Sequence, residues 1–496
     1  MFRNNTYYFF LCLLLSYSLI VYPESKKTIT IIGTGYVGLV SGACLAEIGN
    51  SVICADIDVS KIMNLQQGII PIHEQGLNEI IAKNVEAGRL TFTHNINDAI
   101  HYGDIIFIAV GTPMGEDGSA NLSYIDDVVK TIANTISSYK IIVTKSTVPI
   151  GTGKNIRAKL ENEFNVDPML FNIVSNPEFL REGVAVNDFL EPDRLIMGAE
   201  NEESLITMCE IYEPIISSGT PCILTNIQTS EMIKYASNAF LSVKISYINE
   251  IANICDAVDA DVKTVARAMG LDHRISPQFL QPGPGFGGSC FPKDAQALIY
   301  IAQKNNIPLH TVQAALDAND TQQKKPVEKL VNLLHNTYDT DLTNKNIAVL
   351  GLAFKANTDD VRYSPAITTI KLLQEKGATI QAYDPIASDN MKKIFPDIHY
   401  YKSPYKAVTN SDAIIIMTDW DEIKQLDFAK IKMLVKTPIV IDARNIINPE
   451  ILRQLGFTCD AIGQSYLYKQ KNKHPYNLIP SCSRKYKQTK RYSNIR

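Results

Sequence analysis

The segment TITIIGTGYVGLVSGACLAEIGNSVICADID, Thr28 to Asp58, decides the fold of the N-terminal part of the chain. It begins with a run of β-branched residues that is typical of a buried parallel strand, and a second such run ends at Asp56. Between these runs, the glycine turn Gly33-x-Gly35-x-x-Gly38 leads into an apolar helical stretch. A strand, a glycine turn, a helix, a strand and an acidic residue in this order indicate a dinucleotide-binding unit.

Each residue of this fingerprint has a physical role. Gly33 permits the tight turn, Gly35 lets a pyrophosphate approach the N–H groups at the helix N-terminus, and Gly38 permits close packing of the helix on the strand. Asp56 is suited to accept hydrogen bonds from a ribose diol, and its charge would repel a 2′-phosphate. The sequence therefore predicts that NAD binds rather than NADP, and a glycine turn without a ligand is the alternative.

Three polar residues follow further apolar runs that are typical of buried strands. Because ligands bind at the carboxyl ends of parallel strands, we expect Thr112, Thr147 and Glu178 to face the cofactor crevice. Ordinary helix capping by the two threonines is the alternative. The runs are DIIFIAVGTP (104–113), KIIVTKSTVP (140–149) and FNIVSNPEFL (171–180).

Two pairs of polar residues stand four positions apart and would share a face if their segments are helical. Glu178 and Glu182 form the first pair, and Lys234 and Asn238 form the second. A lysine and an asparagine on an apolar helix are costly to bury unless they serve a polar site. A solvated acidic face and a lysine that extends to solvent are the alternatives.

The segment from Thr229 to Asp272 has no strand pattern, no proline and no glycine before Gly270. It predicts one or two long helices, with Thr229 or Ser230 as the N-cap. Its apolar residues fall on several helical faces, which indicates burial on more than one side. We therefore expect a central helical domain that forms a dimer interface.

The loop PGPGFGGSCFPKD, Pro282 to Asp294, places one cysteine among glycines. Pro292 is suited to be the first residue of a helix, which would put the Cys290 thiol at a helix N-terminus. The helix dipole and Lys293 are then expected to lower the pKa of this thiol. The nine cysteines of the chain form no C-x-x-C pair and do not cluster with the eight histidines, so we expect no metal, no disulfide framework and a reducing compartment.

A second strand and helix pattern starts at KNIAVLGLAFKANTDDVRYSP (345–365) and includes a strand that ends at Asp384. It retains only one glycine of the fingerprint, so it predicts a Rossmann-like domain without the dinucleotide turn. Lys355, Arg362 and Arg444 are expected at strand ends, where they would form a cationic crevice for the phosphates of a nucleotide. Surface ion pairs are the alternative for each of them.

The two ends of the chain differ from the rest. The apolar run Tyr7 to Tyr22 is short for a membrane span and about the length of a signal-peptide core. An uncleaved signal or anchor, an over-extended start whose true Met lies elsewhere, and a divergent inert leader are the alternatives. We expect a cytoplasmic catalytic portion, with membrane contact only if this run is retained. The basic tail is expected to be disordered. A net charge of −4 predicts no affinity for nucleic acid.

From residue 28 to residue 467 the chain resembles the UDP-glucose/GDP-mannose dehydrogenase family. The resemblance implies oxidation of the C6 alcohol of a nucleotide sugar to a carboxylate, with two NAD⁺ and one water. UDP-glucose is the expected sugar, and GDP-mannose or an N-acetylated UDP-hexosamine is the alternative. The motifs that carry the resemblance are DHRISPQFLQPGPGFGGSCFPKD (272–294), NPEFLREG (176–183) and SEMIKYASNAFLSVKISYINE (230–250).

The resemblance also implies a role for each site residue. Cys290 would add to the intermediate aldehyde, and the resulting thiohemiacetal would be oxidised to a thioester that water releases. The other implied catalytic residues are Lys234 and Asn238 for the oxyanion, Asp294 for the hydrolytic water, and Glu178 with Thr147 for proton removal.

The fingerprint and the resemblance together give two sets of binding residues. The expected cofactor contacts are Gly33, Gly35, Val37, Gly38, Asp56, Lys61, Thr112, Thr147, Glu182, Lys293 and Arg362. The expected substrate contacts are Glu178, Phe179, Leu180, Arg181, Glu182, Lys234, Phe279, Leu280, Gln281, Pro282, Gly283, Gly287, Lys355 and Arg444, with Arg274 reaching across a dimer interface.

The expected fold is α/β, with two Rossmann-like doubly wound parallel-sheet domains joined by a central all-helical dimerisation domain. The expected divisions are an apolar leader (1–26), an NAD-binding domain (27–212), a central domain with the cysteine loop (213–330), a UDP-sugar-binding domain (331–467) and a basic tail (468–496).

Two other classes of function remain open from the sequence. A two-electron hydroxyacid dehydrogenase could share the Lys234 and Asn238 helix, but it would have no use for Cys290 or for the second Rossmann-like domain. A nucleotide-sugar-binding or membrane-tethered scaffold without turnover would not require Cys290, Lys234, Asn238 and Asp294 to be intact.

Overall fold

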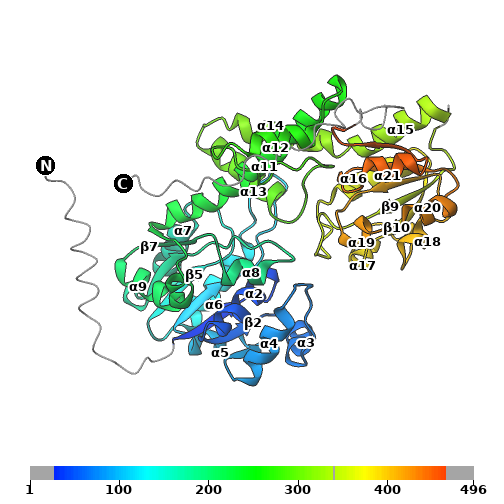
Figure 1. Ribbon diagram of the computed structural model, residues 1–496. Coiled ribbons are helices and arrows are strands. Elements are labelled where there is room, and N and C mark those ends of the chain that lie inside the picture. Colours follow the sequence, from blue (N-terminus) through cyan, green and yellow to red (C-terminus); the bar gives the residue numbers. More distant parts are fainter. Residues whose placement is uncertain (1–26, 339–340, 465–496) are drawn as a thin grey trace, which may run out of the picture.

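The structure is a computed structural model that describes residues 27–338 and 341–464. Two sheet domains are connected by a group of helices, drawn in green at the top of Figure 1. The expected apolar leader and basic tail lie outside the described residues. Within the described ranges, no helix combines the length and the apolar character needed to cross a membrane.

The N-terminal domain contains an eight-stranded sheet whose order reverses between β1 and β4. Neighbouring strands are parallel except for the antiparallel pair β6 and β7. This reversal opens a crevice at the carboxyl ends of the strands, where such sheets bind ligands. The strands, in sheet order, are β3 (Leu90–Thr93), β2 (Ser51–Ala55), β1 (Thr28–Ile32), β4 (Ile105–Ile108), β5 (Lys140–Thr144), β6 (Phe171–Ser175), β7 (Leu195–Ala199) and β8 (Cys222–Thr225).

Helices cover both faces of this sheet. Along β4, Ile105 and Phe107 belong to one hydrophobic core, and Ile106 and Ile108 belong to another. Since successive strand residues point to opposite faces, the sheet is buried on both sides, which confirms the doubly wound prediction. The helices are α2 (Tyr36–Glu47), α3 (Val59–Gln66), α4 (Leu77–Glu86), α5 (Ile96–Tyr102), α6 (Ser123–Thr135), α7 (Thr152–Ala158), α8 (Ala185–Leu190), α9 (Glu202–Ile211) and α10 (Glu213–Ser217).

The C-terminal domain has a six-stranded sheet in which all neighbouring strands are parallel. The strands, in sheet order, are β11 (His399–Tyr400), β10 (Thr379–Tyr383), β9 (Asn346–Leu350), β12 (Ala413–Ile416), β13 (Ile439–Asp442) and β14 (Thr458–Ala461). The helices are α15 (Lys325–Tyr338), α16 (Pro365–Glu375), α17 (Ser388–Lys392), α18 (Pro404–Val408), α19 (Asp421–Lys424), α20 (Phe428–Leu434) and α21 (Pro449–Gln454).

The turn after β9 differs from a dinucleotide turn, as the sequence predicts. A long loop separates Gly351 from the start of α16 at Pro365. Asp384 Oδ2 accepts hydrogen bonds from the backbone N–H groups of Leu352 (2.7 Å) and Ala353 (3.1 Å). Those donors are therefore occupied by a carboxylate of the protein itself.

Two expected domain boundaries are displaced in the structure. Strand β8 pairs with β7, so the first sheet extends to Thr225, beyond the boundary expected after residue 212. Helix α15 crosses the boundary expected after residue 330, and its Val327 and Leu334 side chains belong to the core of the C-terminal domain. The boundary expected after residue 212 falls between α9 and α10, and the one expected after residue 330 falls inside α15.

The central helices begin with the 32-residue helix α11. Its N-cap is Asn226, whose side chain accepts a hydrogen bond from Thr229 N, so the expected cap at Thr229 or Ser230 is wrong. The helix starts against the first sheet, where Ser230 Oγ donates to Ser175 O (3.0 Å), and its far end, at Ala252, packs into the core of the C-terminal domain. The central helices are α11 (Ile227–Val258), α12 (Val262–Gly270), α13 (Phe291–Lys304) and α14 (His310–Gln322).

Helix α11 has an unusual distribution of polar and apolar residues. One face is polar and buried, and another carries large apolar side chains that are exposed in the single chain. The buried polar residues are Ser230, Glu231, Lys234, Asn238, Ser242, Ser246 and Asn249. The exposed apolar residues are Phe240, Tyr247, Ile254 and Val258, which we call the α11 apolar stripe.

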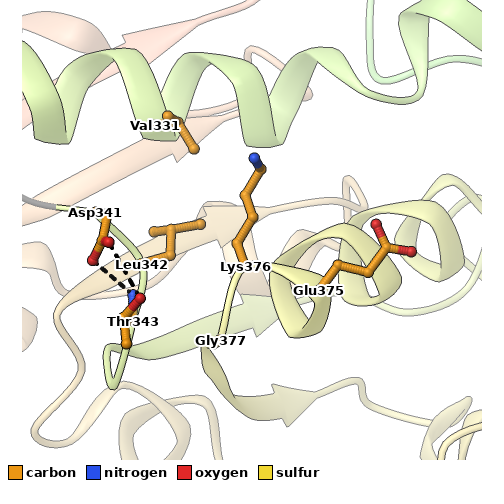
Figure 2. A pocket seen from close by; sticks show the side chains of 7 residues that line it. All are labelled: Val331, Asp341, Leu342, Thr343, Glu375, Lys376 and Gly377. Atoms are coloured by element: carbon orange, nitrogen blue, oxygen red, sulfur yellow. Dashed lines mark hydrogen bonds between the residues drawn. The ribbon is translucent and has the colours of Figure 1, made fainter.

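A surface pocket of about 480 Å³ lies in the C-terminal domain, between α15 and the end of α16 (Figure 2). Asp341 in its wall accepts hydrogen bonds from Thr343. None of its lining residues belongs to the expected site, so this pocket is separate from the residues discussed below. The lining residues are Val331, Asp341, Leu342, Thr343, Glu375, Lys376 and Gly377.

Candidate active site

Cys290 is the N-cap residue of α13, which confirms that its thiol lies at a helix N-terminus. The helix begins at Phe291, so Pro292 is its second residue and not its first. The Cys290 Sγ atom lies 3.6 Å from Ser289 Oγ. Since Phe291 also stacks near Phe279 (ring centroids 6.0 Å apart), the cysteine loop contacts the segment expected to bind the sugar nucleotide.

The electrostatic environment of Cys290 differs from the expectation. Burial raises the pKa of the Cys290 thiol to about 11; Glu178 and Asp294 raise it further, while Lys234 opposes them. Lys293 donates to Asp294 Oδ1 (2.6 Å), so its charge is compensated by that carboxylate. The prediction of a lowered pKa is therefore wrong for this arrangement, because burial and two carboxylates outweigh the nearby cations.

Two buried polar pairs surround the cysteine. Lys234 Nζ donates to Glu178 Oε1 (3.0 Å), and Asn238 Nδ2 donates to Asp294 Oδ2 (2.7 Å). Although burial disfavours its charged form, Glu178, Cys290 and Asp294 raise the pKa of Lys234 above its ordinary value. Lys234 is therefore a permanent hydrogen-bond donor. The shared helical face of Lys234 and Asn238 is confirmed, and it is buried rather than solvated.

The segment PEFLREG is not helical, so Glu178 and Glu182 do not share a helix face. Glu178 points to Lys234 on α11, whereas Glu182 Oε2 accepts from Thr358 Oγ1 (3.0 Å) in the C-terminal domain. Burial, with Asp360 nearby, raises the pKa of Glu182 to about 7, and Arg362 opposes this rise. The Glu178 carboxylate therefore belongs to the Cys290 site, whereas the Glu182 carboxylate contacts the C-terminal domain.

The residues between these two carboxylates are held by neighbouring side chains. The Phe179 ring is contacted by the guanidinium of Arg194 (3.8 Å from the centroid) and by Lys234 Nζ (5.1 Å). Leu180 N donates to Glu178 Oε2 (2.5 Å), and Arg181 forms an ion pair with Asp188. Arg194 was not predicted as a site residue, because nothing in the sequence indicates which ring it would meet.

The glycine turn after β1 fits the pyrophosphate of a dinucleotide. Gly33 has φ +101°, and a Cβ atom on Gly38 would lie 1.8 Å from Gly33 O. A Cβ atom on Gly35 would meet no protein atom within 4 Å, so the space beside it is open. No side chain caps the first turn of α2, which leaves its N–H groups for an anion. Val37 lies half-buried in this turn.

The acidic residue of the fingerprint is also in place. Asp56 Oδ2 accepts from Thr34 N (2.8 Å) and from Lys61 Nζ (2.9 Å), so the expected Asp56 and Lys61 contacts lie together. Despite its burial, hydrogen bonds from Lys61 and from backbone N–H groups keep the pKa of Asp56 below its ordinary value. The carboxylate is therefore ionised, as hydrogen bonding to a ribose diol requires.

Thr112 and Thr147 meet at the carboxyl ends of β4 and β5. Thr112 Oγ1 donates to Thr147 O (2.9 Å). Neither residue is an N-cap, because α6 and α7 are capped by Leu122 and Gly151. The helix-cap alternative is therefore excluded for both threonines.

The glycines of the cysteine loop approach the C-terminal domain. A Cβ atom on Gly287 would lie 2.2 Å from Tyr363 O, and Gly288, with φ +83°, donates its N–H to Arg362 O (2.8 Å). Gly283 N donates to Asn249 Oδ1 (2.8 Å) on the buried polar face of α11. Asn249 was missed, although its helical spacing from Asn238 could have indicated it.

The expected cations of the second domain have different roles in the structure. Arg444 donates to Met417 O (2.8 Å) and Phe354 O (2.6 Å), and burial lowers its pKa. Burial also lowers the pKa of Lys355. Arg274 is exposed and pairs with Asp272, so within the described chain it does not join the Cys290 cluster.

Three family models match this arrangement in sequence order. They are the NAD binding domain (residues 27–216), the central domain (228–321) and the UDP binding domain (348–449) of the UDP-glucose/GDP-mannose dehydrogenases. The chain belongs to this family. The dehydrogenase thus carries its cysteine loop inside the stretch matched by the central domain model, between the two nucleotide-binding regions.

Known relatives of this dehydrogenase are similar over most of their length. A UDP-glucose 6-dehydrogenase of Bacillus subtilis is 46% identical over 88% of this chain and 93% of the relative, and one of Rhizobium meliloti is 44% identical over 88% and 99%. The solved structure of a UDP-glucose dehydrogenase from Pyrobaculum islandicum superimposes with a TM-score of 0.81 at 32% identity, covering 90% of this chain and all of that one.

Proposed function

We propose that this dehydrogenase oxidises UDP-glucose to UDP-glucuronate, using two NAD⁺ and one water for each sugar. The observation that carries the proposal is the buried cluster of Cys290, Lys234, Asn238, Asp294 and Glu178 beside a dinucleotide-type glycine turn. A two-electron alcohol oxidation would not require a nucleophilic thiol in this position. The UDP-glucose 6-dehydrogenases that are about 45% identical to this chain support the choice of sugar.

The residues that would hold NAD are those of the first fingerprint. The N–H groups of the first turn of α2, next to Gly35, would bind the pyrophosphate, and Asp56 with Lys61 would bind the ribose. Thr112, Thr147 and Val37 would line the same crevice. Bound NAD⁺ supplies the hydride acceptor for both oxidations.

Proton transfer and oxyanion stabilisation are assigned to the two buried polar pairs. Lys234 Nζ and Asn238 Nδ2 are donors that would stabilise negative charge on the C6 oxygen. Glu178, held by Lys234 at 3.0 Å, would accept the hydroxyl proton directly or through a water that Thr147 helps to hold. These groups are fixed before substrate binds, so little reorganisation is required.

Cys290 would bind the C6 carbon of the sugar covalently between the two oxidations. A C–S bond forms between Sγ and the aldehyde carbon while the thiol proton passes to the carbonyl oxygen, giving a thiohemiacetal. Its oxidation yields a thioester, and water attacks that thioester as the C–S bond breaks. Asp294 would accept the proton of the attacking water, and the thiol is regenerated. The raised pKa of Cys290 is consistent with a thiol that loses its proton only during addition.

The sugar nucleotide would lie between the cysteine loop and the C-terminal domain. Lys355 is the cation assigned to its phosphates, while Arg444 would act mainly by holding backbone carbonyls beside Gly283. Glu182, Lys293 and Arg362 would contact the cofactor. The segment that would surround the sugar and base is Phe279, Leu280, Gln281, Pro282, Gly283 and Gly287.

We also propose a homodimer that forms through the α11 apolar stripe. Exposed aromatic and aliphatic side chains along one long helix are typical of subunit interfaces. Arg274, which is exposed in the single chain, would then reach the substrate of the partner subunit. A cytoplasmic location of the catalytic portion follows from its use of NAD, and cell fractionation tests it.

The proposed substrate is tested by a comparison of nucleotide sugars. NADH formation is measured with UDP-glucose, GDP-mannose and UDP-N-acetylglucosamine under identical conditions. We expect kcat/KM for UDP-glucose to exceed the others by about 100-fold, because a pocket shaped for one sugar leaves polar groups unpaired with another. A higher kcat/KM for either alternative would move the assignment to that sugar.

A further inference from the structure

Lys145 is a buried lysine that belongs to none of the expected sets. It follows β5 directly and is 4% exposed. Its Nζ atom donates to Asn176 Oδ1 (3.0 Å) and to the Tyr212 hydroxyl (3.4 Å). The same atom lies 5.7 Å from the ring centroids of both Phe189 and Tyr212. We call Lys145, Asn176, Tyr212 and Phe189 the Lys145 cluster.

The orientation of Asn176 is fixed from three sides. Its Nδ2 group donates to Ile196 O (2.9 Å), its backbone N–H donates to Thr144 O (3.0 Å), and the Tyr212 hydroxyl donates to its Oδ1 atom (2.8 Å). The amide oxygen must therefore face Lys145. Asn176 stands two residues before Glu178, with only Pro177 between them.

Lys145 stands, in the same way, two residues before Thr147. The bond from Lys145 to Asn176 therefore ties the carboxyl end of β5 to the carboxyl end of β6. Each strand end carries one of the residues assigned to proton removal, Thr147 and Glu178. Loss of the hydrogen bond between Lys145 and Asn176 would therefore let Thr147 and Glu178 move relative to each other.

The Lys145 amine also interacts electrostatically with the catalytic groups Glu178 and Lys234. Among the described residues it forms no ion pair, and burial lowers its pKa to about 7; Glu178 favours its charged form and Lys234 disfavours it. The titratable groups that face it are thus Tyr212 between α9 and α10, Glu178 after β6 and Lys234 on α11. An amine buried without a carboxylate partner is destabilising, so it calls for a functional reason.

We propose that Lys145 is a positioning residue of the oxidation, which holds the turn from Asn176 to Glu178 so that the Glu178 carboxylate faces Lys234. The inference rests on the proposed function, since it assigns Lys145 to the same catalytic centre. In this role Lys145, which is 4% exposed, would act through Glu178 and not through contact with the substrate or the cofactor. Its loss should therefore lower kcat more than it raises KM.

Lys140 provides a matched control on the same strand. It lies at the opposite end of β5, is also buried, and donates to His101 O (3.0 Å). Lys140→Met and Lys145→Met each remove one buried amine at one end of β5, but only the second change affects the end that leads to Thr147. Melting temperature, kcat, KM and the pH profile of kcat/KM are measured for both variants and for the unaltered protein.

We expect Lys145→Met to lower kcat by about 10- to 100-fold, as a misplacement of roughly 1 Å at a catalytic group does. KM for the sugar should change by less than about threefold, since no substrate contact is lost. The pH profile of kcat/KM should change near pH 7, because the Lys145 amine that ionises there is removed. Lys140→Met should keep kcat within about twofold and leave the profile in place, whatever its melting temperature.

Equal kcat values and unchanged pH profiles for the two variants would overturn the proposal. Tyr212→Phe keeps the ring but removes a hydroxyl that bonds both Lys145 and Asn176, so it serves if Lys145→Met does not fold. It should lower kcat at constant KM, and an unchanged kcat would contradict the proposal. All variants are assayed with whichever nucleotide sugar the unaltered protein oxidises, so a wrong substrate assignment is recognised separately. If the unaltered protein oxidises none of these sugars, both proposals are contradicted.

Discussion

At the scale of single residues, buried charged side chains surround Cys290 and keep its thiol protonated. Glu178 and Asp294 are each held by a donor on α11, and both raise the pKa of Cys290. Lys234 acts in the opposite direction but is itself paired with Glu178. The nucleophile therefore rests as a thiol, and its reactivity depends on how strongly these neighbours oppose the thiolate.

Removal of the Glu178 charge should make Cys290 more reactive toward alkylation while turnover is lost. In Glu178→Gln the carboxylate that raises the thiol pKa is gone and Lys234 is released to stabilise the thiolate. A fall of one unit in that pKa gives about a tenfold faster reaction with iodoacetamide at pH 8. Peptide mass spectrometry at Cys290 measures the rate, and Glu79→Gln at an exposed position is the control. A slower reaction in Glu178→Gln would contradict this electrostatic account.

The sequence predicted the identities of these residues better than their environment. Lys234 and Asn238 were found because a helix has a fixed repeat, and their shared buried face follows from it. The pKa of Cys290 was predicted in the wrong direction, because its burial and the nearby Glu178 and Asp294 carboxylates arise from tertiary packing that no local pattern shows. Lys145 was not singled out, since no local pattern reveals which side chains a strand end will meet.

At the scale of elements, α11 and the glycine turns set the positions of the functional groups. Helix α11 presents its polar residues to the interior in one continuous row, so the Glu178 and Asp294 partners are fixed on a single rigid element. The irregular PEFLREG segment directs Glu178 and Glu182 to different places, which a helical reading of the sequence could not predict. Such a segment has no repeat from which its side-chain directions follow.

Two glycines of the turn after β1 should respond differently to the addition of one methyl group. Gly35→Ala places its Cβ in open space, so the melting temperature should not change, whereas NAD affinity should fall by about tenfold or more because the pyrophosphate is obstructed. Gly38→Ala would press against Gly33 O and should cost about 1–3 kcal/mol of folding stability. Calorimetric titration with NAD and thermal unfolding measure the two effects. Equal loss of stability in both variants would contradict this assignment of the turn.

At the scale of the whole molecule, the two sheet domains are linked by the central helices (Figure 1). The cysteine loop contacts the C-terminal domain through Gly287 and Gly288. Gly183 of the first domain and Gly287 of the loop both approach backbone atoms of the C-terminal domain. The first domain and the cysteine loop are therefore both packed closely against the C-terminal domain. The proposed dimer would cover the α11 apolar stripe, which is exposed in the single chain.

Charged substitutions in this stripe should separate the proposed dimer. Phe240→Glu with Tyr247→Glu would place two carboxylates in an apolar interface, where their desolvation is unfavourable. Light scattering at micromolar concentration should then give a mass near 55.1 kDa, compared with twice this value for the unaltered protein. Met433→Glu, at an exposed position of α20 in the C-terminal domain, is the control and should remain dimeric. A monomeric unaltered protein would contradict the proposed interface.

The central claim is that Cys290 carries the sugar through two successive oxidations at one site. It is tested most directly by counting the NADH formed for each UDP-glucose consumed, in the unaltered protein and in Cys290→Ala. We predict two NADH per sugar for the unaltered protein, and no formation of UDP-glucuronate by Cys290→Ala. One NADH per sugar in the unaltered protein, or two in Cys290→Ala, would contradict the proposed covalent role of the thiol.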